Sequence, residues 1–299
     1  MIKQATAADA EILETLLGMP HGTAPVPEKL FDGAAHPQND IAALRMRAAY
    51  RAYGLEHASC RFYLVSDGGG APLAALCLLG QSALYSGALG DAEELAAFLH
   101  FAGVCSFTSE SMLLPQWKAV PQLLMRLAPQ AAPDVFAVPV EDKPNLWALA
   151  HSGLFAGAEP DAWYADACTR VNKGLADIRA VPTAALFGAA AAEQDGPYAA
   201  AAGFYCIEDG AVYLNAVATQ EKYRGCGCAC TLISTLAASY PSSEVSLLCA
   251  PPLRRFYEQL GFVLARPVCV FEAPEPACTE TPAPVCRHTA PQKDTPQRK

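Results

Sequence analysis

The sequence predicts an α+β protein, an α/β sandwich, in which one unit of helices and strands occurs twice. Near the N-terminus, helical patterns are followed by three strands, and the same order begins again near Asp134. In both copies the third strand leads into a further helix and a further strand. Turn signals such as DGGG and Asp209-Gly210 separate the strands, as in antiparallel hairpins. We therefore expect two units, residues 1–133 and 134–272, each with a mixed, mostly antiparallel sheet flanked by helices.

The first unit opens with a short strand and an apolar helix, and a second helix follows a Pro/Gly-rich loop. Three strands with turns between them come next, and then the further helix and strand. The expected ranges are a strand at 2–6, helices at 8–17 and 40–53, strands at 61–66, 73–79 and 82–89, a helix at 91–102 and a strand at 104–109.

The second unit repeats this order. We expect a strand at 135–140, helices at 145–154 and 161–172, strands at 179–192, 198–207 and 211–219, a helix at 228–239 and a strand at 245–249. Residues 273–299 carry six prolines among Thr, Gln, Glu and Lys and have almost nothing to bury. This composition predicts a disordered tail.

Composition limits the function classes. The chain has 299 residues, a formal net charge of -9 and a pI near 5.2. It therefore lacks the excess of Lys and Arg with which proteins bind nucleic acids and anionic membranes. No secretory signal and no bilayer-spanning apolar run is present, and we expect a cytoplasmic protein. The twelve cysteines are scattered through apolar surroundings and are expected to be reduced. The acidic balance favours a small or cationic partner.

The stretch EKYRGCGCAC, residues 221–230, lies between a predicted strand and a predicted helix. A glycine-containing turn at this place presents unpaired backbone N–H groups at the positive end of the helix dipole, and Arg224 adds a cation. These features predict a phosphate-binding loop. The alternative is a metal or redox site, but Cys226, Cys228 and Cys230 would point in different directions along a helix. We expect no metal.

Two motifs in this region resemble one family. The loop from Arg224 to Ala229 fits the Q/R-x-x-G-x-G/A pyrophosphate loop of the GNAT superfamily of acyl-CoA-dependent N-acetyltransferases. The segment FYEQLGF, residues 256–262, is similar to the family's FYEKLGF segment, which ends a helix and turns into the last strands. The resemblance is specific over residues 211–270. It implies that acetyl-CoA is a cosubstrate and that the chain consists of tandem GNAT-like domains.

The resemblance also implies roles for individual residues. Backbone groups near Val217 and Thr219 would pair with pantetheine, and Tyr257 would protonate the departing thiolate. The amine would attack the thioester directly in a ternary complex. The residues expected to anchor the pyrophosphate are Arg224, Gly225, Cys226, Gly227, Cys228 and Ala229.

Other interpretations stay open at this stage. Tyr257 could be an aromatic residue that only packs, and Arg224 a surface cation. The protein could be a non-catalytic acyl-CoA-binding sensor or regulatory module. Ala250 stands where many family members have an asparagine, and the strand 211–219 contains no carboxylate that could act as a general base.

The first unit lacks the loop motif. After its third strand the sequence continues Gly90-Asp91-Ala92-Glu93-Glu94, and three carboxylates would repel a pyrophosphate. We therefore expect residues 1–133 to form a degenerate GNAT-like domain that does not bind CoA. The acceptor is expected to be a small-molecule or peptide amine, with no nucleic-acid or membrane partner.

Overall fold

The structure, a computed structural model, describes residues 1–19, 40–110, 114–128, 137–155, 159–208 and 210–274. The expected disordered tail, residues 273–299, lies outside the described residues except for its first two positions. Within these ranges, no helix combines the length and the apolar character that crossing a bilayer requires.

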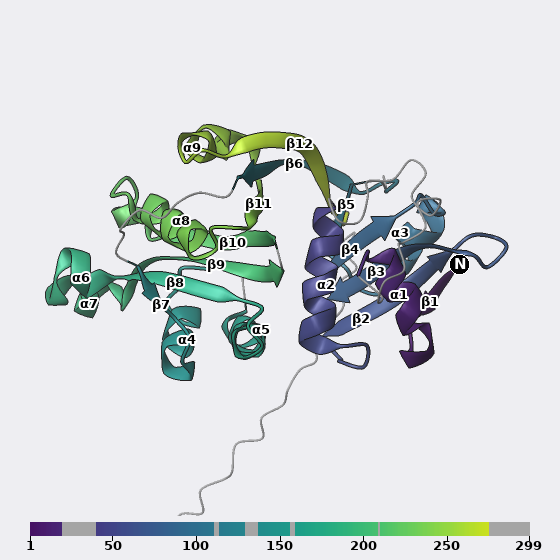
Figure 1. Ribbon diagram of the computed structural model, residues 1–299, viewed down its shortest axis with the longest axis horizontal. Coiled ribbons are helices and arrows are strands. Elements are labelled where there is room, and N and C mark those ends of the chain that lie inside the picture. The colour runs from purple at the N-terminus through teal and green to yellow at the C-terminus, as the bar shows by residue number, and fades with distance from the viewer. Residues whose placement is uncertain (20–39, 111–113, 129–136, 156–158, 209, 275–299) are drawn as a thin grey trace, which may run out of the picture.

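One sheet of twelve strands runs through both halves of the molecule (Figure 1). Its order is β1-β2-β3-β4-β5-β12-β6-β11-β10-β9-β8-β7. Neighbouring strands are antiparallel except for the pairs β4–β5 and β10–β11, which are parallel. The predicted mixed, mostly antiparallel α+β class is confirmed. The bounds are β1 (Ile2–Gln4), β2 (Cys60–Ser66), β3 (Pro72–Leu79), β4 (Ser82–Gly87), β5 (Ser106–Ser109), β6 (Lys118–Leu127), β7 (Val138–Pro139), β8 (Asp177–Pro182), β9 (Tyr198–Glu208), β10 (Ala211–Thr219), β11 (Glu244–Cys249) and β12 (Val263–Glu272).

Helices cover both faces of this sheet. In the first half, α1 and α2 pack on one face, and α3 packs on the other. In the second half, α8 and α9 share a core on one face, and α4 and α5 share a core on the opposite face. The bounds are α1 (Ala10–Leu16), α2 (Ile41–Tyr53), α3 (Ala92–Phe101), α4 (Lys143–Ala150), α5 (Pro160–Asn172), α6 (Thr183–Phe187), α7 (Ala189–Asp195), α8 (Cys228–Ser239) and α9 (Arg254–Gln259).

The two halves exchange strands at the centre of the sheet. β6 belongs to the first half by sequence, but it lies between β11 and β12 of the second half and pairs antiparallel with both. In return, β12 pairs with β5 of the first half, from Cys269 opposite Ser109 to Glu272 opposite Ser106. Figure 1 shows β6 and β12 as long strands that connect the two lobes. Each half therefore completes its sheet with a strand from the other.

The expected strand at 179–192 is wrong beyond Pro182. β8 ends at that residue, and two short helices, α6 and α7, follow. The sequence there is TAALFGAAAAEQD, in which alanine, the best helix former, dominates. Gly188 separates the two helices with a φ of 87°. The apolar character of the segment suggested a strand, but its intrinsic propensity favours helix.

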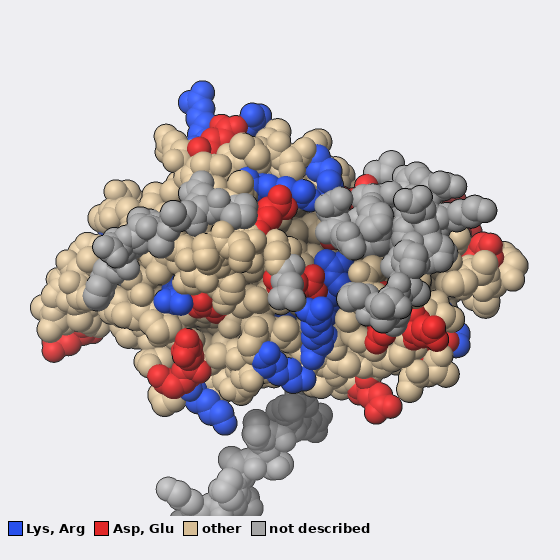
Figure 2. Space-filling view, viewed as in Figure 1, with Lys and Arg blue, Asp and Glu red and all other residues tan. Residues whose placement is uncertain are grey.

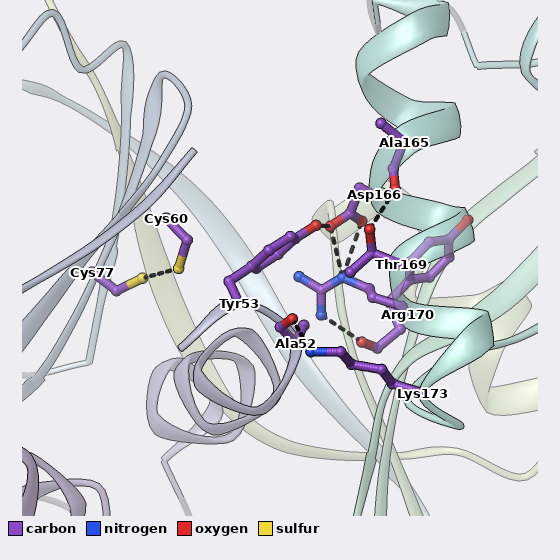
Figure 3. A network of polar contacts seen from close by, with 10 residues as sticks. Ala52, Tyr53, Cys60, Cys77, Ala165, Asp166, Thr169, Arg170 and Lys173 are labelled. Atoms are coloured by element: carbon purple, nitrogen blue, oxygen red, sulfur yellow. Dashed lines mark hydrogen bonds and ion pairs between the residues drawn. The ribbon is translucent and has the colours of Figure 1, made fainter. Parts of the chain in front are cut away.

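Polar contacts hold the helices of the two halves together (Figure 3). Tyr53, at the end of α2, donates a hydrogen bond from its hydroxyl to Asp166 on α5. The same carboxylate accepts from Arg170 Nε at 2.8 and 3.0 Å. Lys173 Nζ donates to the carbonyl oxygen of Ala52 at 2.6 Å. α2 and α5 are thus fixed side by side.

A second set of charges lies along α2. Figure 2 shows basic side chains gathered over this helix in the middle of one face, beside acidic ones. α2 carries Arg45, Arg47 and Arg51. Arg47 is buried and its Nε lies 2.9 Å from an oxygen of Glu208 on β9, and Arg51 lies 3.4 Å from the other oxygen. This part of the patch therefore pairs with the other half of the chain.

Candidate active site

The strands β10 and β11 separate near the middle of the second half. They pair in parallel only from Ala211 opposite Glu244 to Tyr213 opposite Ser246, although β10 continues to Thr219 and β11 to Cys249. Beyond Tyr213 the facing backbone groups of the two strands are not paired with each other. A wedge-shaped opening in the sheet results, and it offers backbone hydrogen bonds to a ligand.

A β-bulge shapes the β10 side of this opening. Asn215 pairs with Gly203 and Ala218 with Ala201, so two residues, Ala216 and Val217, stand opposite one residue of β9. Ala216 has a φ of 52°, in the left-handed region that non-glycine residues avoid. Such strain is held in place by its surroundings and concentrates at functional sites. The bulge therefore turns backbone groups next to Val217 away from the regular ladder.

The predicted loop lies where β10 ends and α8 begins. Gly225 and Gly227 have φ values of 81° and 80°, and a Cβ at either would meet no atom of the described structure within 4 Å. Gly227 is the N-cap residue of α8 and, as a glycine, supplies no side-chain cap to the first-turn N–H groups of this helix. The conformation requires glycine, and the space above it is open. This combination suits a pyrophosphate.

A cavity of about 1060 Å³ connects these parts. Its lining includes every predicted site residue except Cys226, which is exposed and is not among the lining residues. The predicted residues that line it are Val217, Thr219, Arg224, Gly225, Gly227, Cys228, Ala229 and Tyr257. The structure thus brings the glycine loop, the bulged strand and the candidate acid to one place.

Tyr257, on α9, is 7% exposed and lies in the core cluster beneath α8. Phe256 and Phe262 contact its ring edge to face, at centroid distances of 5.0 and 5.6 Å. Burial, with smaller contributions from the neighbouring Cys249 and Tyr213, raises the pKa of Tyr257 to about 12. At neutral pH the phenol keeps its proton and can donate it.

The loop is braced from outside by the segment that contains α6 and α7. Phe187 stacks on Tyr223 at 4.0 Å with the rings 12° apart. The Tyr223 hydroxyl donates to Asp195 at 2.5 Å, and Lys222 forms an ion pair with the same carboxylate. Gln220 Nε2 donates to the Asp195 carbonyl oxygen at 2.7 Å. These contacts fix the residues just before Arg224.

The three cysteines of the loop do not converge. Cys226 is exposed, Cys228 is buried, and Cys230 lies between these extremes. In the described part of the chain, no group of three or more His, Cys, Asp or Glu side chains is placed to hold a metal ion. Burial raises the pKa of the Cys228 thiol.

In the first half, the turn before α3 corresponds to the glycine loop, and a side chain of that turn occupies the N-terminus of the helix. Asp91 caps α3, and its Oδ1 accepts hydrogen bonds from the backbone N–H groups of Glu93 at 2.9 Å and Glu94 at 3.1 Å. The helix end that would receive a phosphate is thereby satisfied. This contrasts with the uncapped α8.

Comparisons with solved structures identify the fold of the chain, whereas comparisons with sequences find no match. No family model and no curated protein sequence matches the chain. Among solved structures, a tandem GNAT protein from the clavulanic acid biosynthesis pathway superposes with a TM-score of 0.54 at 13% identity, covering 91% of this chain and 98% of the other. The chain has a tandem GNAT fold. GCN5-related N-acetyltransferases from Sphaerobacter thermophilus and Kribbella flavida superpose with TM-scores of 0.55 and 0.52, at 14% and 15% identity. They match 91% and 80% of this chain and 94% and 96% of their own.

One wall of the cavity could not be identified from the sequence. Leu154 and Phe155 were assigned to the end of a helix or just after it, but α4 ends at Ala150 and both residues line the cavity from the following loop. Ser152 Oγ donates to the Leu149 carbonyl oxygen, which helps to end the helix there. Trp163 on α5 joins them. No motif signals these residues, because the motifs that carry the GNAT resemblance lie within residues 211–270.

Proposed function

We propose that the protein is an acetyl-CoA-dependent N-acetyltransferase in which the second half of the chain carries the site. The observation that supports this most is that one cavity is lined by the glycine loop, by the part of β10 beyond its pairing with β11, and by Tyr257. The loop and Arg224 would hold the pyrophosphate, and backbone groups near Val217 and Thr219 would pair with pantetheine. The tandem GNAT fold is consistent with acyl transfer.

The reaction would be a direct attack in a ternary complex. The amine nitrogen forms a bond to the thioester carbonyl carbon, and the carbon–sulfur bond then breaks. Tyr257, whose phenol is protonated at neutral pH, donates its proton to the departing thiolate. The proton lost by the nitrogen restores the Tyr257 phenol, so amine and thioester become amide and free thiol with no net change in protons.

The test is calorimetric titration of acetyl-CoA and of CoA into the wild type and two variants, Gly227→Glu and Gly227→Gln. Both variants place a side chain at a φ of 80°, so they carry a similar backbone cost, and only Glu adds a negative charge. We expect one site per wild-type chain and a Kd that is much higher for Glu than for Gln. Failure of the wild type to bind acetyl-CoA would overturn the proposal.

A second candidate is a non-catalytic acyl-CoA-binding module. It is favoured by the absence of Asp, Glu and His from the described residues that line the cavity, and by Ala250 in place of an asparagine. Separating CoA from acetyl-CoA by chromatography distinguishes the two. Amine-dependent release of CoA indicates transfer, whereas tight binding without release across an amine panel indicates the module.

A further inference from the structure

The cavity reaches both faces of the sheet. Along β9, Ala200 and Ala202 face the core that contains Tyr257 and α8, and Ala201 and Tyr205 face the core that contains α4 and α5. Trp163 belongs to the second core and Tyr257 to the first, yet both line the same cavity. The cavity therefore has a CoA side, on the α8 face, and an acceptor side, on the α5 face, and residues 215–219 of β10 line it.

The acceptor side is walled by aromatic rings. Phe155 and Trp163 stack with their centroids 4.8 Å apart and their planes 28° apart. Trp163 meets the ring of Tyr205 edge on, at 6.4 Å. Tyr205 is 7% exposed, so it anchors the wall from below. Together with Leu154, the rings of Phe155 and Trp163 give this side of the cavity a preformed, apolar lining.

No carboxylate faces this surface among the described residues. Arg224 is the one charged side chain in the described lining, and it belongs to the glycine loop. Neither acidic residue of α5 is among the described lining residues: Asp161 is exposed and lies 3.4 Å from His151 Nε2, and Asp166 binds Arg170 and Tyr53. An ammonium ion bound against the wall would lose hydration and find no carboxylate among the described lining residues, and cation–π contact with the rings offsets only part of that cost. Asn215, an uncharged polar residue, also lines the cavity and directly precedes the bulge residues Ala216 and Val217.

We propose that the acceptor is an amine attached directly to an aromatic ring, an inference that rests on the proposed acetyltransferase function. The ring would lie on Phe155 and Trp163, and Asn215 would face its polar substituents. An arylamine is uncharged at neutral pH, so it enters the cavity without a counter-ion and needs no base before it attacks. An alkylamine with a pKa of about 10 is only about 0.1% uncharged at pH 7. The net charge of the chain favoured a cationic acceptor, but the lining of the cavity favours a neutral one.

The test compares three amines on the enzyme saturated with CoA. They are p-anisidine, 2-phenylethylamine, which has a ring but a basic nitrogen, and putrescine, which has no ring. We expect calorimetry at pH 7 to detect p-anisidine, with the other two at least about tenfold weaker. With acetyl-CoA, p-anisidine should give the acetylated product by chromatography. The rate with 2-phenylethylamine should rise about tenfold per pH unit while the fraction of free base increases.

Substitutions at Trp163, Trp147 and Asn215 test whether the aromatic wall binds the acceptor. Trp163→Ala should weaken p-anisidine binding about tenfold and leave acetyl-CoA affinity within about twofold. Trp147→Ala is the matched control, because Trp147 is 48% exposed, stacks on His151 and is outside the described cavity lining. Asn215→Asp adds a carboxylate with almost no change in shape, and it should raise the preference for 2-phenylethylamine over p-anisidine.

The outcomes separate the two proposals. Acetyl-CoA binding together with faster acetylation of putrescine than of p-anisidine, or no detectable p-anisidine binding, overturns the arylamine inference and leaves the transferase standing. Equal effects of Trp163→Ala and Trp147→Ala on p-anisidine binding also overturn it. Absence of acetyl-CoA binding in the wild type rejects the proposed function itself.

Discussion

Removal of β6 should unfold the half of the chain that carries the site. A fragment of residues 134–299 lacks this strand, so β11 and β12 lose the partner that lies between them. Three β6 side chains, Leu124, Met125 and Leu127, are at most 3% exposed. At about 1.5–3 kcal/mol each, their burial contributes about 5–9 kcal/mol. This is comparable to the entire free energy of unfolding of a typical domain, about 5–15 kcal/mol.

The assay is urea unfolding followed by circular dichroism on three chains: full length, residues 115–299, and residues 134–299. We expect cooperative unfolding for the first two and none for the third. In the full-length chain, Met125→Ala should cost about 2–5 kcal/mol. Lys118→Ala, which removes an exposed ion pair with Glu272, should cost less than about 1 kcal/mol. A fragment 134–299 that unfolds cooperatively at the midpoint of 115–299 refutes the reasoning.

Three further predictions concern the site and the region between the halves. Tyr257→Phe should lower kcat by about 10²–10⁴ and leave the Kd of acetyl-CoA nearly unchanged, as measured by product chromatography and calorimetry; an unchanged kcat would leave Tyr257 a packing residue. Burial and the nearby charge of Glu110 raise the pKa of Asp40 to about 6, so the folded state holds a proton that the unfolded state releases, and stability should fall by up to about 3 kcal/mol as pH rises from about 4 to 6. Asp40→Asn, which can still cap α2, should remove this slope in urea titrations across that range, and a slope that persists assigns it to another group. Acetyl-CoA at about 100 times its Kd should slow iodoacetamide modification of Cys230 about 100-fold by mass spectrometry and leave the exposed Cys105 unaffected, whereas equal rates with and without ligand would place the ligand elsewhere.

The sequence predicted the local elements well because their periodicity and turn residues are local signals. β10 and α8 begin and end at the residues expected, and the glycine loop lies between them. The exchange of β6 and β12 could not be predicted in this way. β12 pairs with β5 more than 150 residues earlier in the chain, and β6 contains Pro121, which weakens its strand pattern.

The residues of the candidate site also differ in whether a local sequence signal identifies them. Arg224, Gly227 and Tyr257 belong to short motifs, so they could be identified before their positions were known. Phe155 and Trp163 are ordinary aromatic residues in sequence, and only the fold brings them to the cavity that Tyr257 also lines. The residues proposed to bind the cosubstrate could thus be identified from the sequence, and the residues proposed to select the acceptor could not.

The brace on the glycine loop has a consequence for the kinetics of binding. Phe187 and Asp195 hold Tyr223 and Lys222 in place before any ligand arrives. A ligand that meets a loop already in its final shape loses little additional conformational entropy on binding. Association should then depend linearly on ligand concentration in stopped-flow experiments, with no slow first-order phase. Loosening the brace with Phe187→Ala should introduce such a phase and turn a single encounter step into two.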